Sequence, residues 1–296
     1  MSRIFEALQR SEAERSGTPF EANALATDLL LAAEREAATV DAAPAQAAIP
    51  LGQPLEAQTI APLVSPDTRL ISMTDQESLA AEKFRFLSVR LRQMQQTRKL
   101  HRVLITSTLP EEGKSLVAAN LAATLARRRQ QKVLLLEGDL RRPVLARQFG
   151  HPSLPGITEW LYAPSASINN NIYYLEGPGF WFLPAGHPPE NPLELMQTGR
   201  LGSLLEQLTA SFEWIIIDSP PLLPLADTSV WTRLADGILL VVREGKTEKR
   251  QLQRGLEALD RSRLLGVVMN SCSSTGNKNY YLHYGPGAAS SEEPRK

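Results

Sequence analysis

Apolar runs and amphipathic stretches alternate along most of the chain. Strand-like runs occur at 101–107, 132–138, 212–219, 237–243 and 264–271, with a shorter run at 180–186. Several of them are continuously apolar rather than alternating, which is typical of strands buried on both faces. Apolar residues at helical spacing are found at 77–96, 114–129, 199–210, 226–234 and 247–261. Buried strands that alternate with helices predict an α/β fold with a doubly wound, mainly parallel sheet.

The two ends of the chain have a different composition. The apolar residues of 1–15 share one helical face, and this segment is either a docking helix for a partner or a marginal helix that frays in solution. A second helical stretch follows at 22–36, and the Ala- and Pro-rich residues 37–67 indicate a linker. We therefore expect three parts: an N-terminal helical segment and linker (1–69), a folded domain (70–272) and a flexible tail (273–296).

Charge and cysteine content narrow the class of protein. Lys and Arg together number 32, as do Asp and Glu, so the charge balance gives no reason to expect a nucleic-acid partner. The single cysteine, Cys272, excludes an intramolecular disulfide and indicates a reducing compartment, where it is a small buried residue at a strand end. The most apolar stretch, 214–225, contains Asp218 and three prolines and cannot cross a bilayer. We expect a soluble, cytoplasmic protein that reaches a membrane only through a partner.

A phosphate-binding loop is predicted at "TSTLPEEGKSLVAANLA" (106–122), which lies between a predicted strand and a predicted helix. The usual pattern is G-x-x-x-x-G-K-[ST]; Thr108 replaces the first glycine, and the Gly-Lys-Ser end is intact. Backbone N–H groups of such a loop hold phosphate oxygens, a lysine neutralises them and a serine hydroxyl binds Mg²⁺. The residues expected to bind ATP here are Glu112, Gly113, Lys114, Ser115 and Leu116.

Carboxylates follow two of the predicted strands. Glu137 and Asp139 end one strand, in "LLLEGDLRRP", and Asp218 ends another, in "WIIIDSPP". Ligands of an open parallel sheet bind outside the carboxyl ends of its strands, so all three acids are expected beside the phosphate loop. A strand-end acid that only caps a helix is the alternative. With Lys114 these acids form the predicted catalytic set, and Ser115, Asp139 and Asp218 are the predicted Mg²⁺ ligands.

The order of these motifs resembles the bacterial tyrosine kinases of capsule and exopolysaccharide synthesis. The resemblance covers about residues 77–272, and the stretches "GITEWL", "LPAGHPPENPLEL", "DSPPLLPLADT" and "VVREGKT" support it. It implies a P-loop NTPase-like kinase domain that uses ATP and Mg²⁺. It also implies that Glu137 or Asp139 deprotonates a substrate tyrosine, that Asp218 lies near the metal and that Asn270 contacts adenine.

The resemblance further implies a substrate and partners. Tyr280, Tyr281 and Tyr284 lie in "NKNYYLHYG", in the predicted tail, and are the expected autophosphorylation sites, presented to a neighbouring subunit of a homo-oligomer. The alternative is that these tyrosines pack back on the last strand. Family members without a membrane segment work with a separate membrane-embedded activator, the polysaccharide co-polymerase, which recruits them to the inner face of the membrane. A tyrosine phosphatase is the expected counterpart, and the process is control of polysaccharide length or export.

The sequence departs from the family at two positions. Glu137 stands where the family usually has Asp, and a displacement of ~1 Å can cost about 10² in rate. In the oligomerisation motif E-x-x-R-x-x-R, Glu82 and Arg85 match, Ser88 replaces the last Arg, and Arg90 is a substitute. Two other functions stay open: a positioning or partition ATPase, against which Leu109 counts because such proteins carry Lys there, and an ATP-binding regulator without kinase activity.

Overall fold

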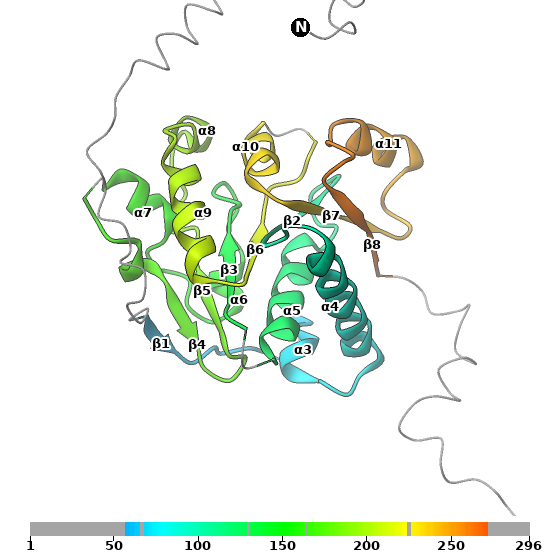
Figure 1. Cartoon of the computed structure of the whole chain (residues 1–296), viewed down its shortest axis with the longest axis horizontal. Coiled ribbons are helices and arrows are strands. Elements are labelled where there is room, and N and C mark those ends of the chain that lie inside the picture. The colour runs from blue at the N-terminus through cyan, green and yellow to red at the C-terminus, as the bar shows by residue number, and fades with distance from the viewer. Residues whose placement is uncertain (1–56, 66–67, 129–130, 164, 224–225, 272–296) are drawn as a thin grey trace, which may run out of the picture. The chain divides into compact units, whose positions relative to one another are not determined.

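The computed structural model describes residues 57–65, 68–128, 131–163, 165–223 and 226–271 (Figure 1). The two predicted N-terminal helices, Cys272 and the three tail tyrosines lie outside these residues. No helix in the described part of the chain combines the length and the apolar character needed to span a bilayer.

One eight-stranded sheet forms the centre of the domain, in the order β1-β4-β5-β3-β6-β2-β7-β8. Its strands are β1 (Gln58–Ile60), β2 (Arg102–Ser107), β3 (Val133–Glu137), β4 (Tyr173–Leu175), β5 (Phe180–Leu183), β6 (Trp214–Asp218), β7 (Gly237–Arg243) and β8 (Leu264–Asn270). The neighbouring strands β5, β3, β6, β2, β7 and β8 all pair in parallel. At the other edge of the sheet, β4 is antiparallel to β5 and β1 is parallel to β4. The predicted mainly parallel sheet is confirmed.

Helices cover both faces of this sheet. They are α3 (Ile71–Thr74), α4 (Leu79–Thr97), α5 (Lys114–Ala126), α6 (Leu145–Gln148), α7 (Ile157–Tyr162), α8 (Pro192–Met196), α9 (Arg200–Ser211), α10 (Asp227–Leu234) and α11 (Lys249–Glu257). One core joins α3, α4 and α5 to the sheet, and these helices lie together in Figure 1. The other core contains residues of α7 to α11. The sheet is therefore doubly wound, as predicted.

Helix α5 is enclosed almost completely, because it lies between the sheet on one side and α3 and α4 on the other. Apart from Leu116, every one of its residues is buried. Its sequence is rich in alanine, so neighbouring backbones approach closely, and it is apolar on all sides as a sandwiched helix must be. This packing fixes the helix whose first turn carries Lys114 and Ser115.

The structure corrects the predicted linker. Residues 37–67 were expected to be a linker, yet 58–60 form strand β1 at the edge of the sheet, with Ile60 buried. Nearby, the Leu63 amide donates to the Phe149 carbonyl at 2.9 Å. Strand β4 and the short helices α3, α6, α7 and α8 also have no counterpart among the predicted elements. Elements of three to six residues are too short for a periodic pattern to be recognised.

Candidate nucleotide-binding and catalytic site

The phosphate loop, residues 108–113, joins the end of β2 to the start of α5. Gly113 is in the left-handed region, with φ +93°, and a Cβ at this position would lie 2.1 Å from Asn270 Nδ2. The same Asn270 nitrogen donates to the Glu112 carbonyl at 2.9 Å. The second glycine of the motif is thus required by both conformation and space. Asn270 lies against the loop, as expected of a residue at this site, and its contact with adenine stays a prediction.

Thr108 occupies the place of the first glycine, and its φ angle is not positive. Among the non-glycine residues of the loop, Glu111 has the left-handed conformation, with φ 63°. Thr108 is fully buried, and its carbonyl accepts a hydrogen bond from the Leu223 amide at 3.2 Å. Gly255 of α11 packs against it, since a Cβ on Gly255 would lie 3.0 Å from Thr108 Oγ1. The departure from the usual pattern is therefore accommodated by the surrounding fold.

The side chain of Glu112 braces the loop from inside. Glu112 is fully buried; its Oε2 accepts from the Leu109 amide at 2.8 Å, and its Oε1 accepts from the Thr247 hydroxyl. Thr247 in turn accepts from the Arg243 amide at 2.9 Å. The neighbouring Glu111 forms an exposed ion pair with Lys246 at 2.8 Å. The "REGKT" turn after β7 therefore holds the phosphate loop. In the sequence, only the family resemblance points to this turn.

Lys114, Asp139 and Asp218 form a buried cluster at the ends of β3 and β6. Lys114 Nζ lies 2.9 Å from Asp139 Oδ2, 3.7 Å from Asp218 Oδ1 and 3.2 Å from Ser115 Oγ. Burial opposes the charge of Lys114, but the carboxylates of Asp218 and Asp139 outweigh burial and raise the pKa of this ammonium. The structure thus brings together four of the predicted site residues.

Asp218 is the most unusual member of this cluster. It is fully buried, and neither carboxylate oxygen has a hydrogen-bond partner among the described residues. Burial raises its pKa to about 6, and Lys114 acts in the opposite direction. A buried acceptor without a partner costs free energy unless a cation or a donor completes it. This carboxylate is therefore suited to a ligand that brings positive charge.

The nucleotide pocket, a cavity of about 550 Å³, opens beside this cluster and is lined by Gly113, Lys114, Ser115, Asp139 and Arg142 among others. Mg²⁺ is commonly bound by one or two carboxylates together with phosphate oxygens and waters. Asp218, Asp139 and the Ser115 hydroxyl fit that donor set. In the described residues no group of three or more His, Cys, Asp or Glu side chains forms a metal site by itself.

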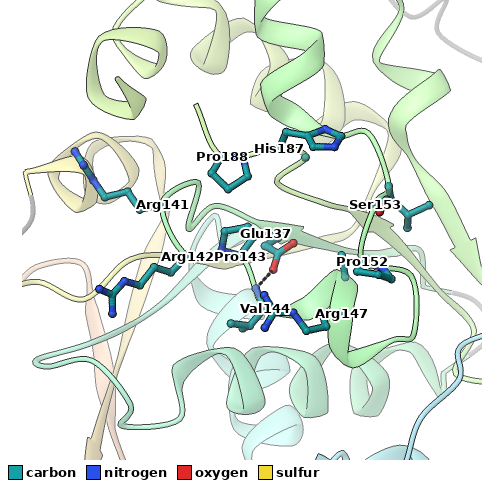
Figure 2. Close-up of a pocket in the computed structure, with 13 residues that line it drawn as sticks. Glu137, Arg141, Arg142, Pro143, Val144, Arg147, Pro152, Ser153, His187 and Pro188 are labelled. Carbon is teal, nitrogen blue, oxygen red and sulfur yellow. Dashed lines mark hydrogen bonds between the residues drawn. The ribbon is translucent and has the colours of Figure 1, made fainter. Parts of the chain in front are cut away.

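Glu137 makes contacts of another kind. Its Oε1 accepts from the amides of Val144 (2.7 Å) and Leu145 (2.5 Å), and its Oε2 accepts from the Ala185 amide at 3.2 Å; Figure 2 shows the bond to Val144. Burial raises its pKa to about 7, although these three amides act against the shift. These contacts match the helix-cap alternative, because the carboxylate ties β3 to the start of α6. Its role as a base stays a prediction.

Two further side chains, those of Arg141 and Ser88, have defined partners in the structure. Arg141 forms a bidentate ion pair with the buried Asp227, with Nε–Oδ2 at 2.5 Å and Nη2–Oδ1 at 3.0 Å, which links the end of β3 to α10. On α4, Ser88 is buried and donates to the Arg85 carbonyl at 2.7 Å, while Arg85 pairs with Glu82 of the same helix. The replaced position of the oligomerisation motif therefore lies inside the fold.

A phosphate loop, a buried lysine and strand-end carboxylates on a doubly wound parallel sheet define a P-loop nucleotide-binding protein. Tyrosine-protein kinase YwqD of Bacillus subtilis is 35% identical to this chain over 218 residues, which cover 73% of this chain and 91% of that protein. The chain belongs to the bacterial tyrosine kinase family. No protein-family model matches the chain.

Other relatives agree with this assignment. Tyrosine-protein kinase CpsD of Streptococcus pneumoniae is 31% identical over 61% of this chain and 80% of its own length. The succinoglycan biosynthesis transport protein ExoP of Rhizobium meliloti is 34% identical over 65% of this chain, which corresponds to 25% of ExoP. Among solved structures, the kinase domain of the Escherichia coli tyrosine kinase ETK superposes with a TM-score of 0.64 at 27% identity, over 69% of this chain and 82% of that one.

Proposed function

We propose that this protein is an ATP-dependent protein-tyrosine autokinase that phosphorylates Tyr280, Tyr281 and Tyr284 of its own C-terminal segment. The observation that carries the proposal is the buried cluster of Lys114, Asp139 and Asp218 beside the phosphate loop, in which Asp218 lies 3.7 Å from Lys114 and neither of its oxygens has a hydrogen-bond partner among the described residues. Membership of a family of tyrosine kinases supplies the reaction class.

In this proposal the loop amides and Lys114 bind the phosphates, and Ser115, Asp139 and Asp218 hold Mg²⁺. A metal held by these residues would supply positive charge against the negative charge that develops on the phosphate during transfer. Lys114 is paired with Asp139 in the structure, so a phosphate that takes over Lys114 releases an Asp139 oxygen. The released carboxylate can hold the metal or accept the tyrosine proton. Tyrosine is a weak nucleophile while protonated, so a base at this point accelerates transfer.

The partners follow from the relatives. ExoP is named as a transport protein of polysaccharide synthesis, and this chain matches only a quarter of its length. The chimeric protein CapA2B2 superposes on this chain with a TM-score of 0.63 at 27% identity, over 74% of this chain and 94% of that one. We infer that this chain acts with a separate membrane-embedded polysaccharide co-polymerase at the inner face of the membrane. We further propose that the protein forms homo-oligomers and that a tyrosine phosphatase reverses its reaction. The process it regulates is the length or the export of the polysaccharide.

The test is intact-mass analysis and peptide mapping after incubation with Mg²⁺ and ATP. Wild type and Lys114→Met are compared, each with and without the cytoplasmic segment of a co-polymerase. We expect phosphate on the tail tyrosines of the wild type and none on the variant. ATP turnover without tail phosphate identifies a switch ATPase instead, and tail phosphate on purified Lys114→Met refutes the assigned site.

A further inference from the structure

A second cavity, of about 470 Å³, lies beside the nucleotide pocket, and the function proposed above leaves it without a ligand. We call it the Pro–Arg cavity. Arg141, Arg142 and Val144 line both spaces, so the turn after β3 forms a shared wall (Figure 2). The volume is within the range of about 300–1,000 Å³ typical of small-molecule sites.

The walls of the Pro–Arg cavity combine rigid apolar surfaces with cationic groups. Pro143, Pro152 and Pro188 come from three different segments of the chain and line it together with Arg142 and Arg147 (Figure 2). Proline rings offer flat apolar faces that lose no rotamer freedom when an aromatic ring packs on them. Guanidinium groups bind phosphate in a bidentate manner.

The uncompensated charge in this cavity is positive. Neither Arg142 nor Arg147 has a side-chain hydrogen bond or an ion pair among the described residues, and both are exposed. Arg141 is neutralised by Asp227, and His187 contacts Glu159, with 2.7 Å between Nδ1 and Oε1.

The acid that lines the cavity, Glu137, carries at most one negative charge, so the net charge of Glu137, Arg142 and Arg147 together is positive. Both of its oxygens accept hydrogen bonds from backbone amides, which turns the carboxylate into part of the wall. Two guanidinium groups that have no ion pair in the described part of the chain therefore remain available to an anion, next to apolar surfaces that suit a ring.

We propose that the Pro–Arg cavity binds a phosphotyrosyl side chain, with the ring against the prolines and the phosphate held by Arg142 and Arg147. A tyrosyl phosphate carries about −1.5 to −2 charges and three acceptor oxygens, which two guanidinium groups can satisfy. This role of the Pro–Arg cavity rests on the proposed function, since phosphotyrosine is the product of that reaction. The cavity retains a phosphorylated tyrosine beside the pocket in which the next transfer takes place.

The test measures binding without turnover. Fluorescent peptides with the sequence of residues 276–288 carry phosphotyrosine at the position of Tyr281, plain tyrosine there, or phosphoserine there. Their anisotropy is titrated with the full chain at ~0.15 M salt, with ADP and Mg²⁺ present to fill the nucleotide pocket. Arg147→Glu is the test variant, because Arg147 lines only the Pro–Arg cavity. Arg254→Glu, an exposed position on α11 outside both cavities, is the matched charge control.

We expect the phosphotyrosyl peptide to bind at least tenfold more tightly than the other two. Arg147→Glu should remove that preference, while its melting temperature and ADP affinity stay those of the wild type, and Arg254→Glu should retain it. Equal binding of the tyrosyl peptide, equal binding of the phosphoseryl peptide, or an equal loss in Arg254→Glu would each overturn the proposal. Displacement by ADP would also overturn it, because the phosphate would then occupy the nucleotide pocket. A kinase-dead protein that still binds the phosphotyrosyl peptide would separate this proposal from the proposed activity.

Discussion

Thr247 donates its hydroxyl hydrogen to the buried carboxylate of Glu112, across 135 positions of the chain. The same hydroxyl accepts from the Arg243 amide, and the other oxygen of Glu112 accepts from the Leu109 amide. The turn that follows β7 is thereby joined to the backbone of the phosphate loop, which follows the neighbouring parallel strand β2. The phosphate loop is therefore held in shape in part by Thr247 and Arg243, which lie outside the phosphate-binding motif.

Thr247→Val should therefore weaken nucleotide binding. The change keeps the volume but leaves one oxygen of buried Glu112 without its donor, which costs about 1–3 kcal/mol of the free energy of unfolding. We expect the Kd for ATP–Mg²⁺ to rise about tenfold, measured by calorimetry. Thr247→Ser keeps the hydroxyl and is the control. If Val and Ser variants bind ATP alike, the brace does not shape the loop.

Asp218→Asn should stabilise the protein without nucleotide while abolishing its activity. The folded-state pKa of Asp218 is raised to about 6 from 3.8, so the stability contributed by this group is present below pH ~4 and is lost as the pH rises through 6. Asn has no such loss. We expect the variant's advantage in urea unfolding to be on the order of 1 kcal/mol at pH 7.5 and to shrink toward pH 5.

The matched measurement for Asp218→Asn is binding of Mg²⁺ with a non-hydrolysable ATP analogue. Loss of the carboxylate should reduce the metal dependence of binding, whereas Asp227→Asn, which alters a buried acid of α10, should leave that dependence unchanged. A variant that is less stable than wild type at pH 7.5 would contradict the unfavourable burial of Asp218.

Glu137 and Asp139 should respond differently to amide substitution. Glu137 accepts hydrogen bonds from three amides, and Gln keeps an oxygen for the amides of Val144 and Leu145 while it loses the bond from Ala185. We expect Glu137→Gln to keep autophosphorylation within about tenfold of wild type. Asp139→Asn should lose about 10²–10⁴, as expected when a base is removed.

Glu137→Asp provides the control for position 137. The shorter side chain cannot reach the amides of α6 and of Ala185 together, so it should lower the free energy of unfolding more than Gln does. Single-turnover rates with saturating ATP separate chemistry from binding. A loss of more than 10² in Glu137→Gln at unchanged ATP affinity would instead assign the base to Glu137.

Replacing Tyr280, Tyr281 and Tyr284 with Phe should remove most of the phosphate that the protein acquires, with no change in ATP affinity. Phe retains the ring and lacks the acceptor hydroxyl, so only transfer to these positions is lost. Peptide mapping after incubation with ATP and Mg²⁺ measures the result. Replacement of Tyr162, an exposed tyrosine of α7, is the matched control and should leave labelling intact. Undiminished labelling of the triple variant would place the substrate elsewhere.

The order of strands and helices could be predicted because each long element carries its own pattern. The run ending at Ser107, the Gly-Lys-Ser sequence and the following helix are contiguous, so one stretch defines the phosphate loop. The carboxyl ends of β3 and β6 meet because the strands are parallel neighbours, and this places Asp218 and Asp139 around Lys114. Parallel topology alone therefore accounts for much of the cluster.

The remaining features depend on contacts between distant segments. Strand β1 is three residues long and is defined by pairing with β4, which is itself three residues long. The donors to the Glu137 carboxylate lie on α6 and at Ala185, and the donors to the Glu112 carboxylate include Thr247. No local pattern encodes such pairs. One signal was available for Glu112: an acid in a loop enclosed by apolar elements needs buried donors.

Asn270 ends β8 and donates to the Glu112 carbonyl, so the last described residues of the chain lie at the phosphate loop. Tyr280 follows Ser271 by nine residues, a tether that spans at most about 30 Å when fully extended. Such a short tether gives the tyrosine an effective concentration in the ~mM range around its point of attachment. A free peptide must reach similar concentrations to compete with it. Transfer to Tyr280 of a neighbouring protomer therefore requires an assembly in which one nucleotide pocket lies within about 30 Å of that neighbour's last β8 residues.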